Sequence, residues 1–155
     1  MSEVIQALQI FTKFGLQRLE WITETLEEEA FDWKMNRQSN TIRWVLTHIS
    51  LVLNVLFPRA ISGDLKYIPP EWPTKYIDNP SFTYQKIQKD IEKGKKTVQE
   101  QLHNLKTDDL KVSLDWYLGP HDREFYLMIL CSEIFHHGGQ IAAIHGNWKR
   151  NKGIP

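Results

Sequence analysis

The sequence has only one cysteine, Cys131, among its 155 residues. A single cysteine excludes an internal disulfide framework and any zinc site built from several thiolates. It fits a reducing compartment, so we expect a cytoplasmic protein in which Cys131 is a buried small hydrophobe. The first residues, Met1 to Val4, lack the basic segment and long apolar run of a signal peptide, which agrees with this expectation.

Excess charge of either sign is also missing, because 19 lysines and arginines balance 19 aspartates and glutamates. Nucleic-acid-binding proteins usually concentrate basic residues on one face, and anionic membranes attract basic segments. The longest apolar-rich stretch, Trp44 to Phe57, is interrupted by polar residues and is too short to span a bilayer. We therefore expect neither a nucleic acid nor a membrane as a partner.

Alternating strand patterns of useful length are absent, whereas four stretches show the spacing of an amphipathic helix. These stretches are Val4–Leu26, Asn40–Phe57, Tyr84–Leu105 and Asp122–Trp148. Ser39 or Asn40 is placed to cap the second helix, and Pro58 marks its end. The stretch from Pro58 to Ser81 holds too many prolines for a helix. The pattern predicts an all-α fold, a four-helix bundle with a long crossover between helices 2 and 3, in one domain spanning residues 1–155.

Within the fourth helix, the apolar spacing predicts which side chains face the core. The expected inward positions are Phe125, Ile129, Glu133, His136 or His137, Gln140 and Ile144. The segment before this helix, residues 106–121, is expected to be irregular. The polar tail, residues 149–155, is expected to be loose.

Glu133 and His137 are four residues apart, so they project from one face of the fourth helix. Carboxylate and neutral imidazole are both good ligands for a divalent transition metal. His48 in the second helix shares the apolar stripe of Val45 and Val52, where a polar ring needs a partner. A metal held by His48, Glu133 and His137 satisfies all three groups. It also leaves open positions for water or substrate, as catalytic sites do.

Other interpretations of these residues stay open. The same three side chains can form a buried hydrogen-bonded cluster without metal. A dinuclear carboxylate site would use Glu-x-x-His twice, at Glu100–His103 and Glu133–His136, with one acidic residue from each remaining helix. The second helix has no acidic residue, which argues against this site. Glu100 and His103 are therefore better interpreted as part of a solvated helix face.

Residues around the three candidate ligands are candidates for a pocket wall or for hydrogen bonds to a ligand. Gln140 follows His137 by one helical turn and is placed to hydrogen-bond it. Trp44, His136 and the connection 58–81 are the other expected contributors to the pocket. Gly-Gly-Gln, which ends at Gln140, also matches the catalytic tripeptide of peptide-release factors. Its helical context and the neutral charge of the chain speak against that function.

Three segments, in the order of the chain, carry a resemblance to a known family. Leu26–Lys34 (LEEEAFDWK) is similar to the family's loop after the first helix. Ser39–His48 (SNTIRWVLTH) resembles its second helix, which carries a single metal-binding histidine. His136–Ile141 (HHGGQI) is close to its His-His-Arg-Gly-Gln run near the end. By these segments and by helix order, nearly the whole chain resembles the DinB family of DinB/YfiT-like metalloenzymes.

The resemblance implies a four-helix bundle with a long crossover, and three histidines around a divalent metal, most often Ni²⁺ or Zn²⁺. His48 matches the ligand of the second helix, and His137 matches the last ligand. Glu133 stands where the family usually has histidine, so the implied site has two histidines and one glutamate. Gly138 replaces the common arginine.

The resemblance also implies an activity. Relatives include S-transferases that use low-molecular-weight thiols and a maleylpyruvate isomerase. We therefore expect a homodimeric, divalent-metal-dependent enzyme, a hydrolase or a thiol-dependent S-transferase, that acts on a small molecule. Its metal would lower the pKa of a thiol or water to give a nucleophile. The alternative is a non-catalytic dimeric bundle or binding protein with a degenerate metal site.

Overall fold

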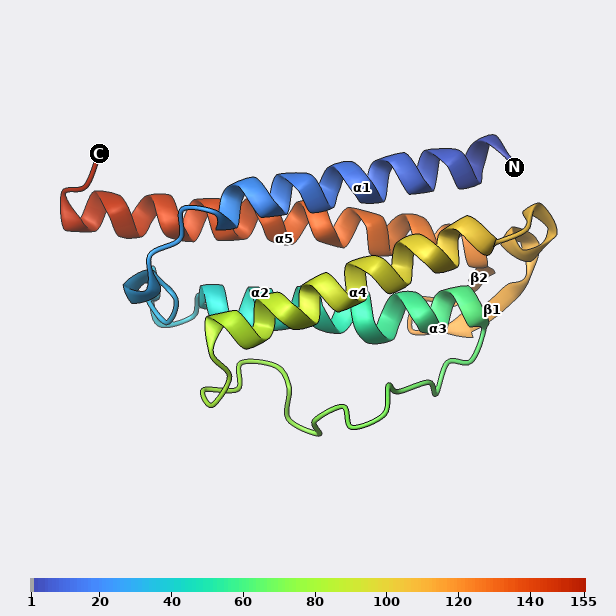
Figure 1. Cartoon of the computed structure of the whole chain (residues 1–155), viewed down its shortest axis with the longest axis horizontal. Coiled ribbons are helices and arrows are strands. Elements are labelled where there is room, and N and C mark those ends of the chain that lie inside the picture. Colours follow the sequence, from blue (N-terminus) through green and yellow to red (C-terminus); the bar gives the residue numbers. More distant parts are fainter. Residues whose placement is uncertain (1) are drawn as a thin grey trace.

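The computed structural model describes residues 2–155 and is mostly helical, as expected (Figure 1). The three longest helices are α1 (Glu3–Thr23), α4 (Tyr84–Asn104) and α5 (Arg123–Lys152). One continuous helical run consists of α2 (Ile42–Leu51), the π-helical segment η2 (Val52–Leu56) and α3 (Phe57–Ser62). The short elements are η1 (Glu28–Ala30), η3 (Thr107–Lys111), β1 (Ser113–Trp116) and β2 (Gly119–Asp122).

The long helices enclose an apolar core. α1 packs on α5 and α4, and α2 packs on the same two helices. In Figure 1, α1 and α5 lie side by side over much of their length. Leu16, Leu46, Ile87 and Leu127 come from four different helices and belong to one core cluster, each almost fully buried. Each such side chain contributes about 1.5–3 kcal/mol through burial.

The helical run that carries His48 begins and ends later than expected. Thr41, rather than Ser39 or Asn40, caps α2, because its Oγ1 accepts a backbone N–H of the first turn at 3.0 Å. Pro58 does not end the run but lies in the first turn of α3. A proline lacks an N–H and clashes with the carbonyl four residues earlier. The wider π-helical turn of η2 precedes Pro58 and accommodates the proline ring and the missing N–H. The helix therefore continues to Gly63.

The same run, Ile42–Ser62, is 21 residues long and reaches a mean hydropathy of 1.5. By length and composition alone it suffices to cross a membrane, so the expectation that this stretch is too short was wrong. Within the fold, 67% of its most apolar window is buried. Packing against α4 and α5 accounts for its apolar character, as in the core helix of a globular protein.

The long connection between α3 and α4, residues 63–83, follows α2 and α4 (Figure 1). Tyr76 anchors its middle and is 3% exposed. The Tyr76 hydroxyl lies 2.7 Å from Ser50 Oγ and donates to Asp90 Oδ2 at 2.6 Å. Burial raises the pKa of Tyr76, and the Asp90 carboxylate raises it further, so the phenol keeps the proton that this bond needs.

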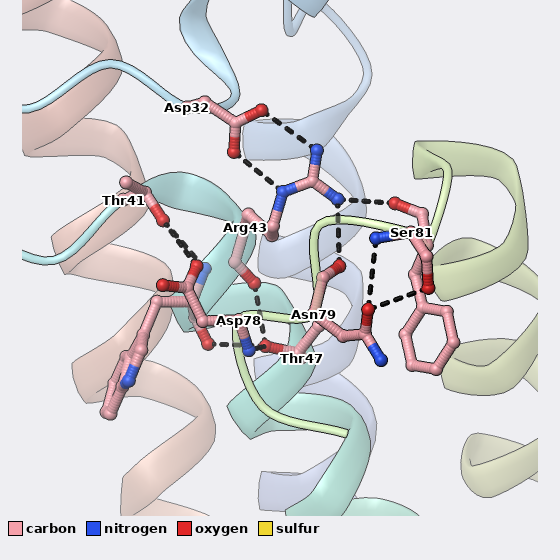
Figure 2. Close-up of polar contacts among 9 residues, drawn as sticks. Asp32, Thr41, Arg43, Thr47, Asp78, Asn79 and Ser81 are labelled. Atoms are coloured by element: carbon pink, nitrogen blue, oxygen red, sulfur yellow. Dashed lines mark hydrogen bonds and ion pairs between the residues drawn. The ribbon is translucent and has the colours of Figure 1, made fainter. Parts of the chain in front are cut away.

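The end of the connection is clamped to the start of α2 (Figure 2). The Asp78 N–H donates to Thr47 Oγ1 at 2.9 Å. Arg43 donates two parallel hydrogen bonds to the Asp32 carboxylate, at 2.6 and 2.9 Å, and also donates to backbone carbonyls of the connection. These charge-assisted bonds fix the first turns of the helix that carries His48.

Residues 113–122 form an antiparallel hairpin where an irregular segment was expected. Ser113 pairs with Asp122, and Trp116 pairs with Gly119. The turn residues Tyr117 and Leu118 have negative φ, and Gly119 follows at φ 90°. This order is typical of a tight hairpin turn that is followed by a glycine at positive φ. Strands of four residues are too short to show a period of two in the sequence.

The helix α5 differs from expectation in its length and in its buried face. It continues to Lys152, so most of the tail is helical, and Gly153 at φ 68° ends it. Glu133 and Gln140 were expected inside the core but are only half-buried at its edge. The fully buried stripe lies about one position later and includes Tyr126, Leu130, Ile134, His137, Ile141, Ile144 and Trp148. The buried face is wide because α5 packs on α1 and α2.

Candidate metal centre

His48 of α2 and Glu133 and His137 of α5 lie together where these two helices pack. His137 Nε2 is 2.9 Å from Glu133 Oε2, and His48 Nε2 is 3.6 Å from the same oxygen. One ligand atom from each residue lies within 4.8 Å of the other two. The structure therefore brings together the three residues that sequence analysis nominated. Two imidazoles and a carboxylate are a suitable donor set for a divalent transition metal.

The cluster opens towards solvent on one side. The His137 side chain is 7% exposed, His48 is 23% exposed and Glu133 is 34% exposed. The helical spacing of Glu133 and His137 places both on one face of α5, and His48 faces them from the edge of the apolar stripe of α2. Because exposure increases from His137 to Glu133, one side of the site is accessible to a small molecule.

The hydrogen bond to Gln140 determines which nitrogen of His137 carries the proton. Gln140 Nε2 donates to His136 Nε2 at 3.0 Å, so its Oε1 accepts the Nδ1–H of His137 at 2.9 Å. The neutral ring of His137 then carries its lone pair on Nε2. That lone pair points at the Glu133 carboxylate, which is also an acceptor. Two acceptors at 2.9 Å need a proton or a cation between them, so these residues fit a bound metal.

His48 is held in the form that binds metals. Trp44 stacks on its ring, with centroids 5.1 Å apart and planes inclined by 7°. Burial is the largest cause that lowers the pKa of His48 below 6.5, and a positive charge on His137 acts in the same direction. Glu133 opposes this shift. The net lowering favours neutral imidazole, which is the ligand form.

The other nominated residues lie at different distances from the cluster. Trp44 and Gln140 each contact a candidate ligand. His136 is exposed, bonds to Gln140 and lies edge-on to the His137 ring, with centroids 5.0 Å apart. Glu100 and His103 are exposed on α4, as expected of a solvated face.

A pocket of about 380 Å³ lies beside the cluster. Its walls come from α2, η2, the hairpin and α5, and the lining residues are His48, Val52, Leu56, Trp116, Tyr117, Leu118, Ile129, Leu130 and Glu133. The connection 58–81 was expected to shape this pocket, but it lies along α2 and α4 instead. The hairpin residues were not among those expected in the pocket. Their signal was the apolar pair Tyr117-Leu118 directly before Gly119, where turns usually have polar residues.

The fold and the cluster define a mostly helical protein with a candidate His-Glu-His metal site. The family model of the DinB superfamily matches residues 12–141. The chain therefore belongs to the DinB superfamily, whose members are metal-associated.

The chain is also similar in structure to a conserved protein from Enterococcus faecalis, known from a crystal structure. The TM-score is 0.73 at 15% sequence identity, and the match covers 95% of this chain and 98% of that one. At this identity the similarity shows a shared fold. No curated protein matches the sequence significantly.

Proposed function

We propose that this protein is a divalent-metal-dependent enzyme of the DinB type, in which His48, Glu133 and His137 hold the metal. The observation that carries the proposal is the 2.9 Å approach of His137 Nε2 to Glu133 Oε2, with His48 Nε2 3.6 Å from the same oxygen. Acceptors that face one another in a partly buried site need a cation or a proton between them. Membership in a metal-associated superfamily adds support.

The surrounding side chains prepare the ligands. Gln140 accepts from His137 Nδ1 and so keeps the Nε2 lone pair directed into the site. Trp44 limits rotation of the His48 ring by stacking on it. Glu133 adds one negative charge, and three protein ligands leave positions open for water or substrate. A bound Ni²⁺ or Zn²⁺ ion would lower the pKa of water or of a thiol and supply a nucleophile near neutral pH.

The proposed reaction is a hydrolysis or a thiol-dependent S-transfer on a small molecule, with a low-molecular-weight thiol as the second substrate of the transfer. The adjoining pocket, at about 380 Å³, lies within the size range of small-molecule sites. A cytoplasmic setting, which supplies reduced thiols, is part of the proposal. The single cysteine supports it, because one cysteine cannot form the internal disulfides that are common in oxidising compartments.

The alternative is a non-catalytic dimeric bundle or binding protein with a degenerate metal site. The glutamate at position 133 favours it, because one proton shared between Glu133 and His137 also satisfies the 2.9 Å contact. Under this alternative the cluster is a hydrogen-bonded core group, and the purified protein binds no metal.

The assembly belongs to the same proposal: a single domain over residues 1–155, folded as a four-helix bundle with a long crossover, that forms a homodimer. Mutual packing of α1, α2, α4 and α5 supports the bundle. Large apolar side chains are exposed on α1, among them Ile10 at 62%, Phe14 at 45% and Trp21 at 62%. Apolar side chains gathered on one exposed helix are typical of an interface.

The test is elemental analysis of the purified, untagged protein, before and after incubation with Ni²⁺ or Zn²⁺ and removal of free ion. We expect about one metal per chain in the wild type. Loss of bound metal is expected in His48→Ala and in Glu133→Gln.

Glu100→Gln is the matched control, because Glu100 is an exposed helical glutamate outside the cluster. It should bind metal as the wild type does. A wild-type protein that binds neither ion would contradict the proposal and favour the hydrogen-bonded alternative.

A further inference from the structure

The pocket beside the cluster is divided into a polar end and an apolar body. His48 and Glu133 form the polar end, and neither lysine nor arginine occurs among the described residues that line it. Burial raises the pKa of Tyr117, with the negative charge of Glu133 as the next cause, so its phenol is neutral. The body of the pocket between the hairpin and η2 therefore carries no charged side chain among the described residues.

The apolar body is preformed. The Tyr126 hydroxyl of α5 donates to the Gly119 carbonyl and so fixes the hairpin to the helix. The Trp116 ring packs on Tyr126, with centroids 5.2 Å apart, and on Tyr117, at 4.8 Å. Aromatic pairs at these distances hold one another in place. A ligand that enters the pocket meets a rigid wall and loses little affinity to ordering it.

The side chains at the hairpin turn leave part of this wall exposed. Tyr117 is 54% exposed and Leu118 is 47% exposed, at a turn where small and polar residues are the norm. Both side chains line the pocket, opposite Val52 and Leu56 of η2. An apolar molecule between the turn and η2 would cover surface that the chain itself leaves open.

We propose that the pocket between the hairpin and η2 binds the uncharged, aromatic body of a small-molecule ligand, with the polar end of that ligand at His48 and Glu133. The proposal rests on the proposed function in so far as the ligand is the substrate of the metal site. A neutral aromatic ring meets an apolar wall that matches it in the body of the pocket.

The test compares two probes of nearly equal shape, 2-naphthylmethanol and 2-naphthoate, on the full chain freed of metal by a chelator. Binding is followed by NMR titration of nitrogen-15-labelled protein near neutral pH. We expect 2-naphthylmethanol to shift the signals of Trp116, Tyr117 and Leu118. 2-Naphthoate carries the same ring system and should shift the same signals.

Three variants locate the effect. Leu118→Ser and Trp116→Ala should each weaken 2-naphthylmethanol binding, Trp116→Ala by about tenfold or more. Trp21→Ala is the control, because it removes an exposed tryptophan from α1 and should leave this affinity unchanged. Leu118→Ser keeps the test decisive if Trp116→Ala fails to fold.

Two results overturn the inference: no shift of the hairpin signals by 2-naphthylmethanol, or an affinity for it that both Leu118→Ser and Trp116→Ala leave unchanged. Failure of the proposed function has a different signature. Zn²⁺ should strengthen 2-naphthoate binding if the cluster holds metal, because a carboxylate is a ligand. Hairpin binding that Zn²⁺ leaves unchanged would support the pocket and contradict the metal site.

Discussion

Two histidine–glutamate pairs of α5 have the same chemistry and different surroundings. His137 and His145 are both buried, and Nε2 of each contacts a glutamate Oε2. His145 takes its carboxylate from Glu27, in the segment after α1, and stacks on Trp148 with centroids 5.9 Å apart. His137 takes its carboxylate from its own helix and has His48 as a third polar neighbour.

The first pair joins segments that are distant in sequence, so it works as a structural link between the end of α1 and the end of α5. The second pair lies within one helix, where such contacts add only about 0.2–0.5 kcal/mol. The second pair differs from the first because it has too many hydrogen-bond acceptors: two imidazoles, of His48 and His137, share the one carboxylate of Glu133. A candidate metal site is therefore marked by unpaired lone pairs that point at one another, and not by the residue types.

The largest expected difference between the two pairs is in Zn²⁺ affinity, measured after each histidine is removed in turn. His137→Ala should lower Zn²⁺ affinity by more than about a hundredfold, since it removes a ligand rather than a supporting contact. His145→Ala should leave the affinity within about threefold of wild type, because it holds no ligand. Competition with a chromophoric chelator measures both constants. Equal losses in the two variants would contradict the distinction.

A second test uses stability. If folded protein alone binds the ion, metal at about a hundredfold its dissociation constant raises the free energy of unfolding by about 2.7 kcal/mol. Removing the ion from wild type or from His145→Ala should therefore lower this free energy by that amount. Removal should leave His137→Ala unchanged. Urea unfolding with and without a chelator makes the measurement, and a chelator effect on His137→Ala would mean that the ion binds elsewhere.

A third test measures how much the hydrogen bond from His137 to Gln140 contributes to Zn²⁺ affinity. Gln140→Leu keeps the approximate volume and removes the acceptor of His137 Nδ1–H, so Zn²⁺ affinity should fall by about 10–100-fold. His136→Ala removes the outer partner of Gln140 and an edge contact with the His137 ring, but no hydrogen bond to a ligand, and should change the affinity by less than about threefold. The same competition assay gives both values. A larger effect at His136 would place it, and not Gln140, next to the ligand.

Much of the candidate site was predictable from local sequence. The four-residue spacing of Glu133 and His137 places both on one face of any helix, and the stripe of Val45 and Val52 fixes the side on which His48 lies. The link between His145 and Glu27 was not predictable, since it joins segments far apart in the chain. The hairpin wall was missed for the same reason, because its place over α5 depends on tertiary contacts such as Tyr126 with Gly119.

The limits on predicting the fold were also physical. A period of apolar residues predicts that a helix exists, and the helices were found on this basis. Pro58 was interpreted as a helix end because the rule assumes α-helical geometry, and the π-helical turn of η2 removes that constraint. On α5, apolar residues occur on several sides, so the buried stripe was placed about one position too early. Neighbouring helices α1 and α2 decide that face.

The smallest expected effect concerns the structural pair and is seen at acid pH. The hydrogen bond from His145 is the main cause that holds the pKa of Glu27 below 4.5. A carboxyl group whose pKa is lowered by folding adds stability that is fully present above its unfolded pKa. This stability is lost as the pH falls through the folded value. Urea unfolding should therefore show that wild type loses stability below about pH 5 more steeply than Glu27→Gln does.

Glu28→Gln is the matched control, because Glu28 is the next residue in the same segment and its side chain does not bond to His145 among the described contacts. It should retain the acid dependence of wild type. Metal removal should leave the difference between wild type and Glu27→Gln unchanged, since this pair lies outside the cluster. If Glu27→Gln loses stability in acid as steeply as wild type, the pair does not link α1 to α5 in solution. The contrast between the two pairs would then rest on the metal site alone.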